Sequence, residues 1–381
     1  MQPEISLPLL VAAGLLVGVS GASLIALAMV ITRFRQGLPL VEYEPRRQVP
    51  WNLLDLVLIL LVLLASMASA AYFAGPFSFK DLRPSELPAG GTPAIQAKIE
   101  VKLPSPSATS TQEFKALLQA DAAGKLVALA LAILFITLKV GASWHDLGVS
   151  RRKFASDVRL GATGFLAVFI PIYALQLALT QFVPSEHPIV KLLQLNSNPE
   201  LLFWCLFAAV IVAPITEEFM FRLLFQGWLE SLEHRWLMAN APAVSGPPAS
   251  EATNDFSPQS SAEDLGTVTP DSANPYRSPA PVAEQSNLPV SDPATPPQNL
   301  LVFHRFRPGT LPIVVSALPF ALLHLGNGPD PIPLFFLALV LSYLYRQTHR
   351  IVPCIVLHMC LNGWSMTMLW LALQIDPSVM K

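Results

Sequence analysis

Long apolar runs, separated by short charged stretches, dominate this chain. A helix needs about 20 mainly apolar residues to cross a bilayer, and most of the runs approach that length. The eight runs are Leu7–Ile31, Leu53–Ala74, Leu126–Leu138, Leu160–Leu179, Leu201–Phe225, Thr310–Leu325, Pro331–Tyr345 and Ile351–Leu373. The third, sixth and seventh are short, so we expect them to be tilted, re-entrant or packed inside a bundle. The pattern predicts an all-α polytopic membrane protein with about eight transmembrane helices.

The composition agrees with this pattern and excludes several classes of protein. Apolar residues make up 52% of the chain and charged residues only 13%, against roughly 25% charged residues in soluble proteins. The mean hydropathy is +0.49. A net charge of −2 excludes a broad basic surface, so we expect the lipid bilayer and no nucleic acid as a partner. The cysteines Cys205, Cys354 and Cys360 lie in apolar runs, where we expect them to pack as small hydrophobic residues.

The positive charges predict an orientation. They gather in alternate connections, at Arg33–Arg47, Lys139–Arg159, Arg305–Arg307 and Arg346–Arg350, which the positive-inside rule places in the cytoplasm. Eight crossings then leave both termini on the non-cytoplasmic side. The leading stretch MQPEIS has no positive charge, so we expect an uncleaved first helix. We expect an integral protein of a bacterial inner or plasma membrane.

Two long polar connections divide the chain into four parts. Residues 1–124 form a membrane region of two helices with a long polar loop, and Thr111–Ala123 within it is a candidate surface helix. Residues 125–240 and 299–381 form the two parts of a membrane core. Residues 241–298 are predicted to be a disordered cytoplasmic insert, because residues 241–300 hold 12 prolines, seven acidic residues and one basic residue.

One acidic pair lies inside an apolar run. Glu217 and Glu218 occur in the stretch APITEEFMFRLLF, where Arg222 follows Glu218 by four residues. On a helix, residues four apart share a face, so Glu218 and Arg222 are placed for an ion pair. Glu217 is rotated by about 100° from Glu218 and can point into the bundle. An ionisable residue at membrane depth is costly, which makes this pair a candidate functional site.

Two later helices carry further polar groups at the same spacing. Phe320 and His324 share one helix face, and His358 and Asn362 share another. A short or tilted sixth helix would bring His324 to the membrane depth of His358. Either pair alone is also compatible with polar contacts that merely hold helices together.

These residue types limit the chemistry. The pattern contains no serine or cysteine beside a base, so a covalent intermediate is not indicated. A carboxylate and a histidine can remove a proton from water, while a second histidine and an amide can donate hydrogen bonds to an oxyanion. Such a set suffices to hydrolyse a peptide bond.

The three motifs together resemble those of a known family. EEFMFR at Glu217–Arg222, FALLH at Phe320–His324 and HMCLN at His358–Asn362 occur in the order seen in the CAAX-processing and bacteriocin-processing (CPBP) intramembrane proteases. That glutamate protease or metalloprotease family includes the Rce1-type CAAX prenyl endopeptidases and bacterial "abortive infection" membrane proteins. The stretch LGVSRRKFASDVRLG at Leu147–Gly161 is similar to the segment before the core of prokaryotic members. The resemblance covers about Leu201–Leu373 without the insert.

The resemblance implies a catalytic set. Glu217 would be the general base, and His324 would help to hold and activate the water. His358 and Asn362 would form the oxyanion hole. The implied substrate is a membrane-associated or lipidated protein or peptide, and no cofactor is implied.

It also implies three supporting residues. Arg222 would orient the glutamates, Glu218 would assist, and Phe320 would shape the pocket.

Other functions stay open at this stage. A non-catalytic membrane scaffold or immunity protein on the same fold would use the acidic insert to dock partners. A zinc protease would use Glu217, His324 and His358 as ligands, although no HExxH spacing supports it. A transporter is the least supported, because no inverted repeat is evident.

Overall fold

The computed structural model describes residues 6–45, 48–73, 108–183, 193, 198–240, 309–326 and 328–375. The chain divides into two compact units. One comprises Met1–Arg235 and Phe306–Lys381, and the other comprises Trp236–Arg305. The predicted insert, residues 241–298, lies outside the described residues. The site discussed below belongs entirely to the first unit.

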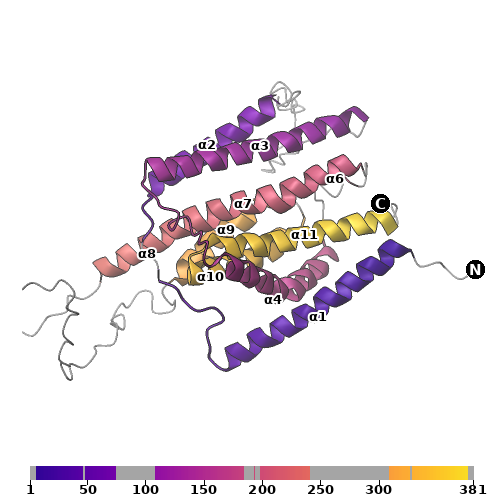
Figure 1. Cartoon of the computed structure of the whole chain (residues 1–381), viewed down its shortest axis with the longest axis horizontal. Coiled ribbons are helices and arrows are strands. Elements are labelled where there is room, and N and C mark those ends of the chain that lie inside the picture. Colours follow the sequence, from indigo (N-terminus) through magenta and orange to yellow (C-terminus); the bar gives the residue numbers. More distant parts are fainter. Residues whose placement is uncertain are drawn as a thin grey trace, which may run out of the picture. The chain divides into compact units, whose positions relative to one another are not determined.

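The described residues are arranged as helices, as the apolar pattern predicted. In chain order they are α1 (Leu7–Arg35), α2 (Leu53–Phe73), α3 (Ala108–Leu138), α4 (Phe154–Thr180), α6 (Pro199–Leu206), η2 (Phe207–Val212), α7 (Ala213–Glu218), η3 (Phe219–Gln226), α8 (Gly227–Ala239), α9 (Thr310–Leu322), α10 (Pro331–Thr348) and α11 (Ile351–Ile375). The run from α6 to α8 is one uninterrupted rod (Figure 1). Counted in this way, the described part of the chain contains eight helical rods, so the predicted all-α fold class is confirmed.

Six of these rods are long and apolar enough to cross a membrane, among the residues that the structure describes. They are α1, α2, α3, α4, the rod from α6 to α8, and α11. Helix α9 has 13 residues, which gives it a length of about 20 Å. The expectation of a short sixth helix is therefore confirmed. The chain is an integral membrane protein, whereas the orientation of its termini stays a prediction.

Helix α3 is much longer than the apolar run that predicted it. It begins at Ala108 instead of Leu126 and absorbs the segment expected to be a separate surface helix. The helix continues because residues 108–125 contain no proline. Gly124 brings α3 close to α2, since a Cβ at this position would lie 3.0 Å from the Ser66 carbonyl oxygen and 3.1 Å from the Ala70 Cβ. Figure 1 shows α2 and α3 side by side.

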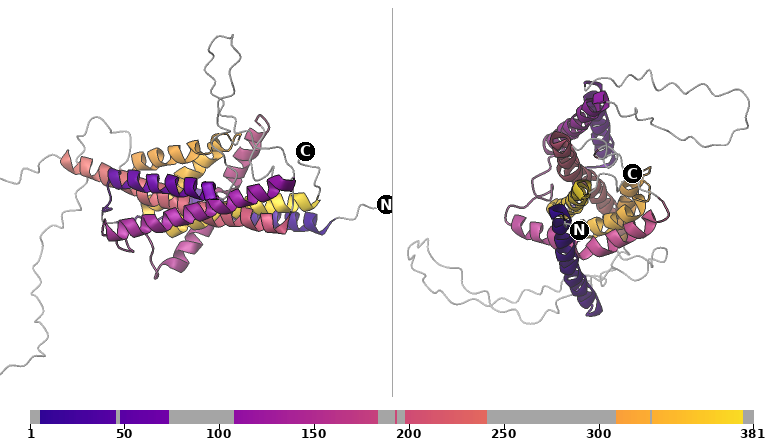
Figure 2. Two further views of the ribbon diagram at one scale, coloured as in Figure 1. Left: turned by 90° about the horizontal axis from the view of Figure 1, so that it is seen from above. Right: turned by 90° about the vertical axis from the view of Figure 1, so that its right-hand side faces the viewer.

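Helix α11 occupies the middle of the first unit. It contacts α1, α4, η2, α7, η3 and α10, and the two views of Figure 2 agree that it lies among the other helices. Two glycines of α4, Gly161 and Gly164, face it. A Cβ on Gly161 would lie 2.6 Å from the Pro353 carbonyl oxygen, so the two backbones almost touch there. This close packing fixes the height of His358 and Asn362, which are both on α11.

Candidate active site

The rod from α6 to α8, Pro199–Ala239, carries the acidic pair, and we call it the glutamate helix. The six-residue α-helical segment α7 ends at Glu218 and lies between the π-helical segments η2 and η3. Widened π turns inside α-helices frequently occur at functional sites. Pro214 contributes to the irregularity, because proline has no N–H to donate to the helical ladder. The glutamates thus lie on a short α-helical step between two widened turns.

The second glutamate forms the buried centre of the site. Glu218 and Arg222 are fully buried, and the Arg222 Nε lies 3.1 Å from Glu218 Oε2. The other carboxylate oxygen, Oε1, lies 2.9 Å from Nδ1 of His358 on α11. A carboxylate only accepts hydrogen bonds when ionised, which assigns the donated proton to Nδ1. The predicted contact between Glu218 and Arg222 is present, and His358 joins it.

Glu217 lies at the more open side of this cluster. Its side chain is 25% exposed, and its Oε2 lies 3.9 Å from Nε2 of His358. This distance is too long for a hydrogen bond, but one water molecule can bridge two polar atoms so separated. His358 therefore stands between the two carboxylates, bonded to Glu218 and facing Glu217.

Phe320 connects His324 to the same cluster. Helix α9 ends at Leu322, so His324 lies in the turn that follows it and not on the helix face predicted for it. The Phe320 ring is fully buried and lies under the Arg222 guanidinium, with 5.1 Å between the Arg222 Cζ and the ring centroid. The ring centroid is 5.8 Å from that of His358 and 5.3 Å from that of His324. Nδ1 of His324 lies 2.9 Å from the Phe320 carbonyl oxygen, which leaves the other ring nitrogen, Nε2, pointing away from that carbonyl group.

Asn362 links α11 by a hydrogen bond to the π segment before the glutamates. Its Nδ2 donates to the carbonyl oxygen of Ala209 in η2, at 2.8 Å. The residue five positions after Ala209 is Pro214, which has no N–H to donate to this carbonyl group across a π turn. An amide nitrogen carries two hydrogens, and this bond uses one of them.

A polar row that was not predicted from the sequence continues from Glu218 along the glutamate helix. Gln226 is fully buried and follows Arg222 by four residues, and Glu230 follows Gln226 by four. The Gln226 Nε2 donates to Glu230 Oε1 at 3.0 Å and to the Ser342 carbonyl oxygen at 2.8 Å. The four-residue spacing of these polar residues was a readable signal of one continuous face.

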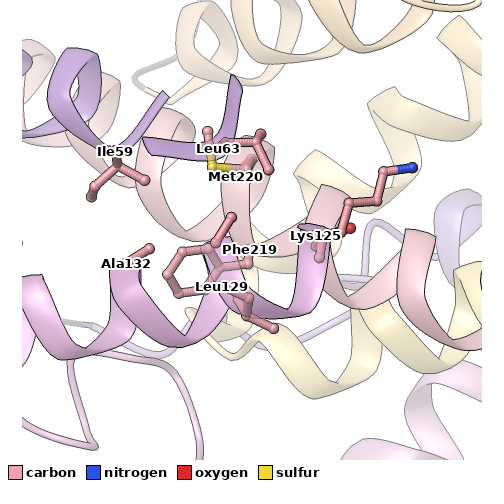
Figure 3. Close-up of a pocket in the computed structure, with 9 residues that line it drawn as sticks. Ile59, Leu63, Lys125, Leu129, Ala132, Phe219 and Met220 are labelled. Atoms are coloured by element: carbon pink, nitrogen blue, oxygen red, sulfur yellow. The ribbon is translucent and has the colours of Figure 1, made fainter. Parts of the chain in front are cut away.

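An apolar crevice lies beside the glutamate helix (Figure 3). The space between its walls, including the part open to solvent, is about 220 Å³. Its lining residues are Ile59, Leu63, Lys125, Ala128, Leu129, Ala132, Thr216, Phe219 and Met220. The crevice therefore includes Thr216 and Phe219, which flank the two glutamates in the sequence, but none of the predicted catalytic side chains.

The side chains of this cluster also bear on whether a metal ion could bind here. Within the ranges that the structure describes, no group of three or more His, Cys, Asp or Glu side chains is arranged to hold a metal ion. The polar cluster combines two carboxylates with a histidine and an arginine, and the positive guanidinium occupies the side of Glu218 that a cation would otherwise approach.

Comparison with known proteins finds a family that the part of the chain around this site resembles. Residues 199–246 and 298–364 match the family model described as type II CAAX prenyl endopeptidase Rce1-like. The matched segments contain all seven residues singled out from the sequence. The comparisons with curated proteins and with solved structures returned no match. In these segments of its membrane core, the chain is similar to the Rce1-like type II CAAX prenyl endopeptidases.

Proposed function

We propose that this chain is an intramembrane endopeptidase in which Glu217 activates a water molecule. The similarity of the membrane core to the Rce1-like family supports a CAAX-type protease. The observation that carries the proposal is the unequal setting of the two carboxylates. Glu218 is fully buried against Arg222, whereas Glu217 is partly open beside His358. The more open setting of Glu217 supports its assignment as the carboxylate that exchanges a proton with water.

The proposed reaction needs no covalent intermediate. Glu217 accepts a proton from water while the water oxygen bonds to the scissile carbonyl carbon, and the carbonyl π electrons move to its oxygen. His358, protonated on both ring nitrogens, donates from Nε2 and Asn362 donates from its second amide hydrogen to the resulting oxyanion. The C–N bond then breaks, and the departing nitrogen takes the proton from Glu217. His324, in the turn after α9, holds the water.

Glu218 and Arg222 act on this reaction through His358. Glu218 accepts the Nδ1 hydrogen of His358 at 2.9 Å and so fixes the plane of the imidazole, with Nε2 toward Glu217. Arg222 balances the charge of Glu218. The two carboxylates therefore have different tasks, one of orientation and one of proton transfer.

The proposed substrate is a membrane-associated or lipidated protein or peptide. A scissile bond must reach Glu217 from the membrane, since the glutamate lies in a membrane-spanning helix. The substrate's apolar part stays in the bilayer or against the glutamate helix. We propose no cofactor for the reaction.

A comparison of protein termini in cells tests the proposal. Mass spectrometry of membrane-protein N- and C-termini would compare the wild type with Glu217→Gln at equal abundance. We expect a set of termini present in the wild type and lost in Glu217→Gln, because the amide cannot accept the proton. Glu200→Gln is the matched control, since Glu200 lies on the same helix with a side chain 56% exposed.

The outcome also separates the two competing functions. Identical termini in the wild type and in folded, abundant Glu217→Gln would contradict the proposal and favour a scaffold. A scaffold instead predicts that deleting residues 241–298 abolishes the effect of the protein in cells. Residues 299–308 are kept in this deletion so that they still join α8 to α9. For the zinc alternative, stoichiometric zinc in the purified protein and loss of cleavage with strong chelators would contradict the cofactor-free reaction.

A further inference from the structure

Helices α9 and α10 form a hairpin, and the turn at its tip carries His324. The two helices pack on each other and on η3. Among the 13 residues of α9, only Thr310 and Ser316 have polar side chains. Within a bilayer no hydrophobic driving force holds apolar helices together, so close packing and the few polar contacts set their register. The polar contacts of the hairpin therefore bear on where His324 lies.

The contacts between α9 and the glutamate helix follow one antiparallel register. At the beginning of α9, the Gly309 backbone N–H donates to Oε2 of Glu233 at 2.8 Å. Farther along, the Ser316 Oγ lies 3.4 Å from Oε1 of Gln226. Seven residues forward on α9 thus correspond to seven residues back on the glutamate helix.

The same register continues to the acidic pair. Four residues beyond Ser316 and four before Gln226 lie Phe320 and Arg222, which contact each other as ring and guanidinium. One further step of four residues on each chain segment pairs His324 with Glu218. The register fixed at Gln226 therefore brings His324 to the level of the glutamates.

Gln226 ties the glutamate helix to the hairpin through polar groups that water does not reach. Gln226, Ser316 and Ser342 are all fully buried, and we call these three residues the buried polar node. The Gln226 Nε2 donates to the carbonyl oxygen of Ser342 on α10 at 2.8 Å. The two serine hydroxyl oxygens lie 3.0 Å apart. The node thus joins η3, α9 and α10 at one point.

A node of this kind serves register more than stability. Replacing buried hydrogen-bonded partners by apolar groups of the same shape is often nearly neutral for stability. The best-attested role of a buried polar group is to select one register among those that apolar side chains would tolerate. A second contact holds the tip of the hairpin, because the Gln176 Nε2 on α4 donates to Asp330 Oδ1 at 2.7 Å. Loss of the Gln226 amide should therefore displace the hairpin without detaching it.

We infer that Gln226 is a positioning residue for the hydrolysis, holding the α9–α10 hairpin in the register that places His324 at the level of Glu217. This role rests on the proposed function and deepens it, because it assigns the placement of His324 to a residue outside the three motifs. Gln226 acts through the hairpin and does not touch the reacting atoms.

Two variants of the buried polar node test this role. Gln226→Met removes the amide and keeps the length of the side chain, and Ser316→Ala removes a single hydroxyl group. Ser23→Ala is the matched control, because Ser23 is also fully buried and its Oγ accepts the Ile170 backbone N–H at 3.3 Å, between α1 and α4. The substrate is a membrane protein whose terminus depends on Glu217. The readouts are kcat and KM for that cleavage, and the midpoint of chemical unfolding in micelles.

We expect Gln226→Met to lower kcat by roughly tenfold or more with KM unchanged, because displacing a catalytic group by about 1 Å costs up to about a hundredfold. Its unfolding midpoint should stay close to that of the wild type. Ser316→Ala should lower kcat in the same direction and by a smaller factor. Ser23→Ala should leave both kcat and the midpoint unchanged.

A double variant with His324→Ala separates positioning from a general loosening of the membrane core. If Gln226 acts by placing His324, Gln226→Met should cause no further loss of kcat in a protein that already lacks this imidazole. Independent effects would instead lower kcat by the same factor in both backgrounds. That second result would overturn the positioning role.

The results also separate this role from the function on which it rests. A wild-type protein without Glu217-dependent cleavage overturns the proposed function, and the positioning role with it. Cleavage by the wild type, together with an equal kcat in folded Gln226→Met, overturns the positioning role alone. Should Gln226→Met fail to fold, the comparison falls to Ser316→Ala, and a kcat equal to that of Ser23→Ala then overturns the role.

Discussion

At the scale of single residues, the feature with the highest cost in desolvation is a pair of opposite charges that water does not reach. Glu218 and Arg222 are both fully buried. Among the described residues, the guanidinium nitrogens of Arg222 have no acceptor with hydrogen-bond geometry, although the group lies over the Phe320 ring. Such a pair adds little net stability and is costly to break. Its value lies in fixing His358, which bonds to Glu218.

Removing only the positive partner should therefore destabilise the protein strongly. Arg222→Met keeps the length of the side chain but leaves the Glu218 carboxylate buried without a counter-charge, so we expect a loss of about 3–5 kcal/mol in the free energy of unfolding. Chemical unfolding in detergent micelles would measure this loss.

The neutral double variant Glu218→Gln with Arg222→Met is the control. It removes both charges, so most of the lost stability should return while cleavage stays impaired. Equal stability of the single and double variants would show that the side chain's packing, and not its charge, matters at position 222.

At the scale of the elements, the sequence predicted more of the helices than of their irregularities. Four-residue spacing correctly brought Glu218 next to Arg222, and apolar length correctly identified α9 as short. The π form of η2 and η3 was not predicted, because the four-residue spacing of the polar residues is that of a regular α-helix. The contacts of the glutamate helix with distant segments were not predictable either, since Trp51 lies 173 residues from its acceptor Leu224. Local pattern carries no information about such a contact.

The contact between His358 and Glu218 was unpredictable for a related reason. The sequence placed each residue on a helix face but said nothing of the height at which α11 passes the glutamate helix. The close approach of α4 to α11 at the α4 glycines sets that height. The sequence alone does not show that the backbone at Pro353 lies next to Gly161. The roles of the individual site residues stay predictions.

A matched series of glycine substitutions tests the packing of α4 on α11. A Cβ on Gly161 would lie 2.6 Å from the backbone oxygen of Pro353, whereas on Gly164 it would meet the flexible Cδ1 of Leu357 at 2.9 Å. We expect Gly161→Ala to destabilise the protein by about 1–3 kcal/mol and Gly164→Ala to cost less. Unfolding in micelles would measure both.

Gly18 in α1 supplies the control for helix propensity. A Cβ there has no neighbour within 4 Å, so Gly18→Ala should be neutral or stabilising by up to about 1 kcal/mol. If Gly161→Ala behaved like Gly18→Ala, the close packing of α4 against α11 would be refuted.

At the scale of the whole molecule, the connection between α1 and α2 joins the N-terminal region to the membrane core by charge as well as by the hydrogen bond of Trp51 to Leu224. We call the described residues of this connection, between Gln36 and Asn52, the strap. Glu44 forms ion pairs with Arg350, between α10 and α11, and with Lys153 at 2.7 Å. Its backbone N–H donates to the Gln347 carbonyl oxygen at 2.7 Å, and its own carbonyl oxygen lies 2.7 Å from Nδ1 of His349. One residue of the strap thus binds the chain before α4 and the turn before α11.

The charge on Glu44 makes this attachment dependent on pH. Burial raises the pKa of Glu44, but the hydrogen bonds and charges of Arg350 and Lys153 outweigh it and hold the pKa below its ordinary value of 4.5. A carboxyl group with a lowered pKa in the folded state stabilises the fold above its ordinary pKa. That stabilisation disappears as the pH falls through the folded-state value.

Stability should therefore respond to acid differently in the wild type and in Glu44→Gln. Near neutral pH we expect Glu44→Gln to be less stable by no more than about 1 kcal/mol, because the side chain is 38% exposed and water screens the pairs. Below the ordinary pKa of 4.5 the two proteins should converge, since Glu44 then becomes neutral as well. Thermal unfolding across this range would measure the difference, with the exposed neighbour Glu42→Gln as control. A gap that stayed constant with pH would mean that Glu44 holds the strap by shape and by its backbone bonds, and the charge would have no part in joining the N-terminal region to the core.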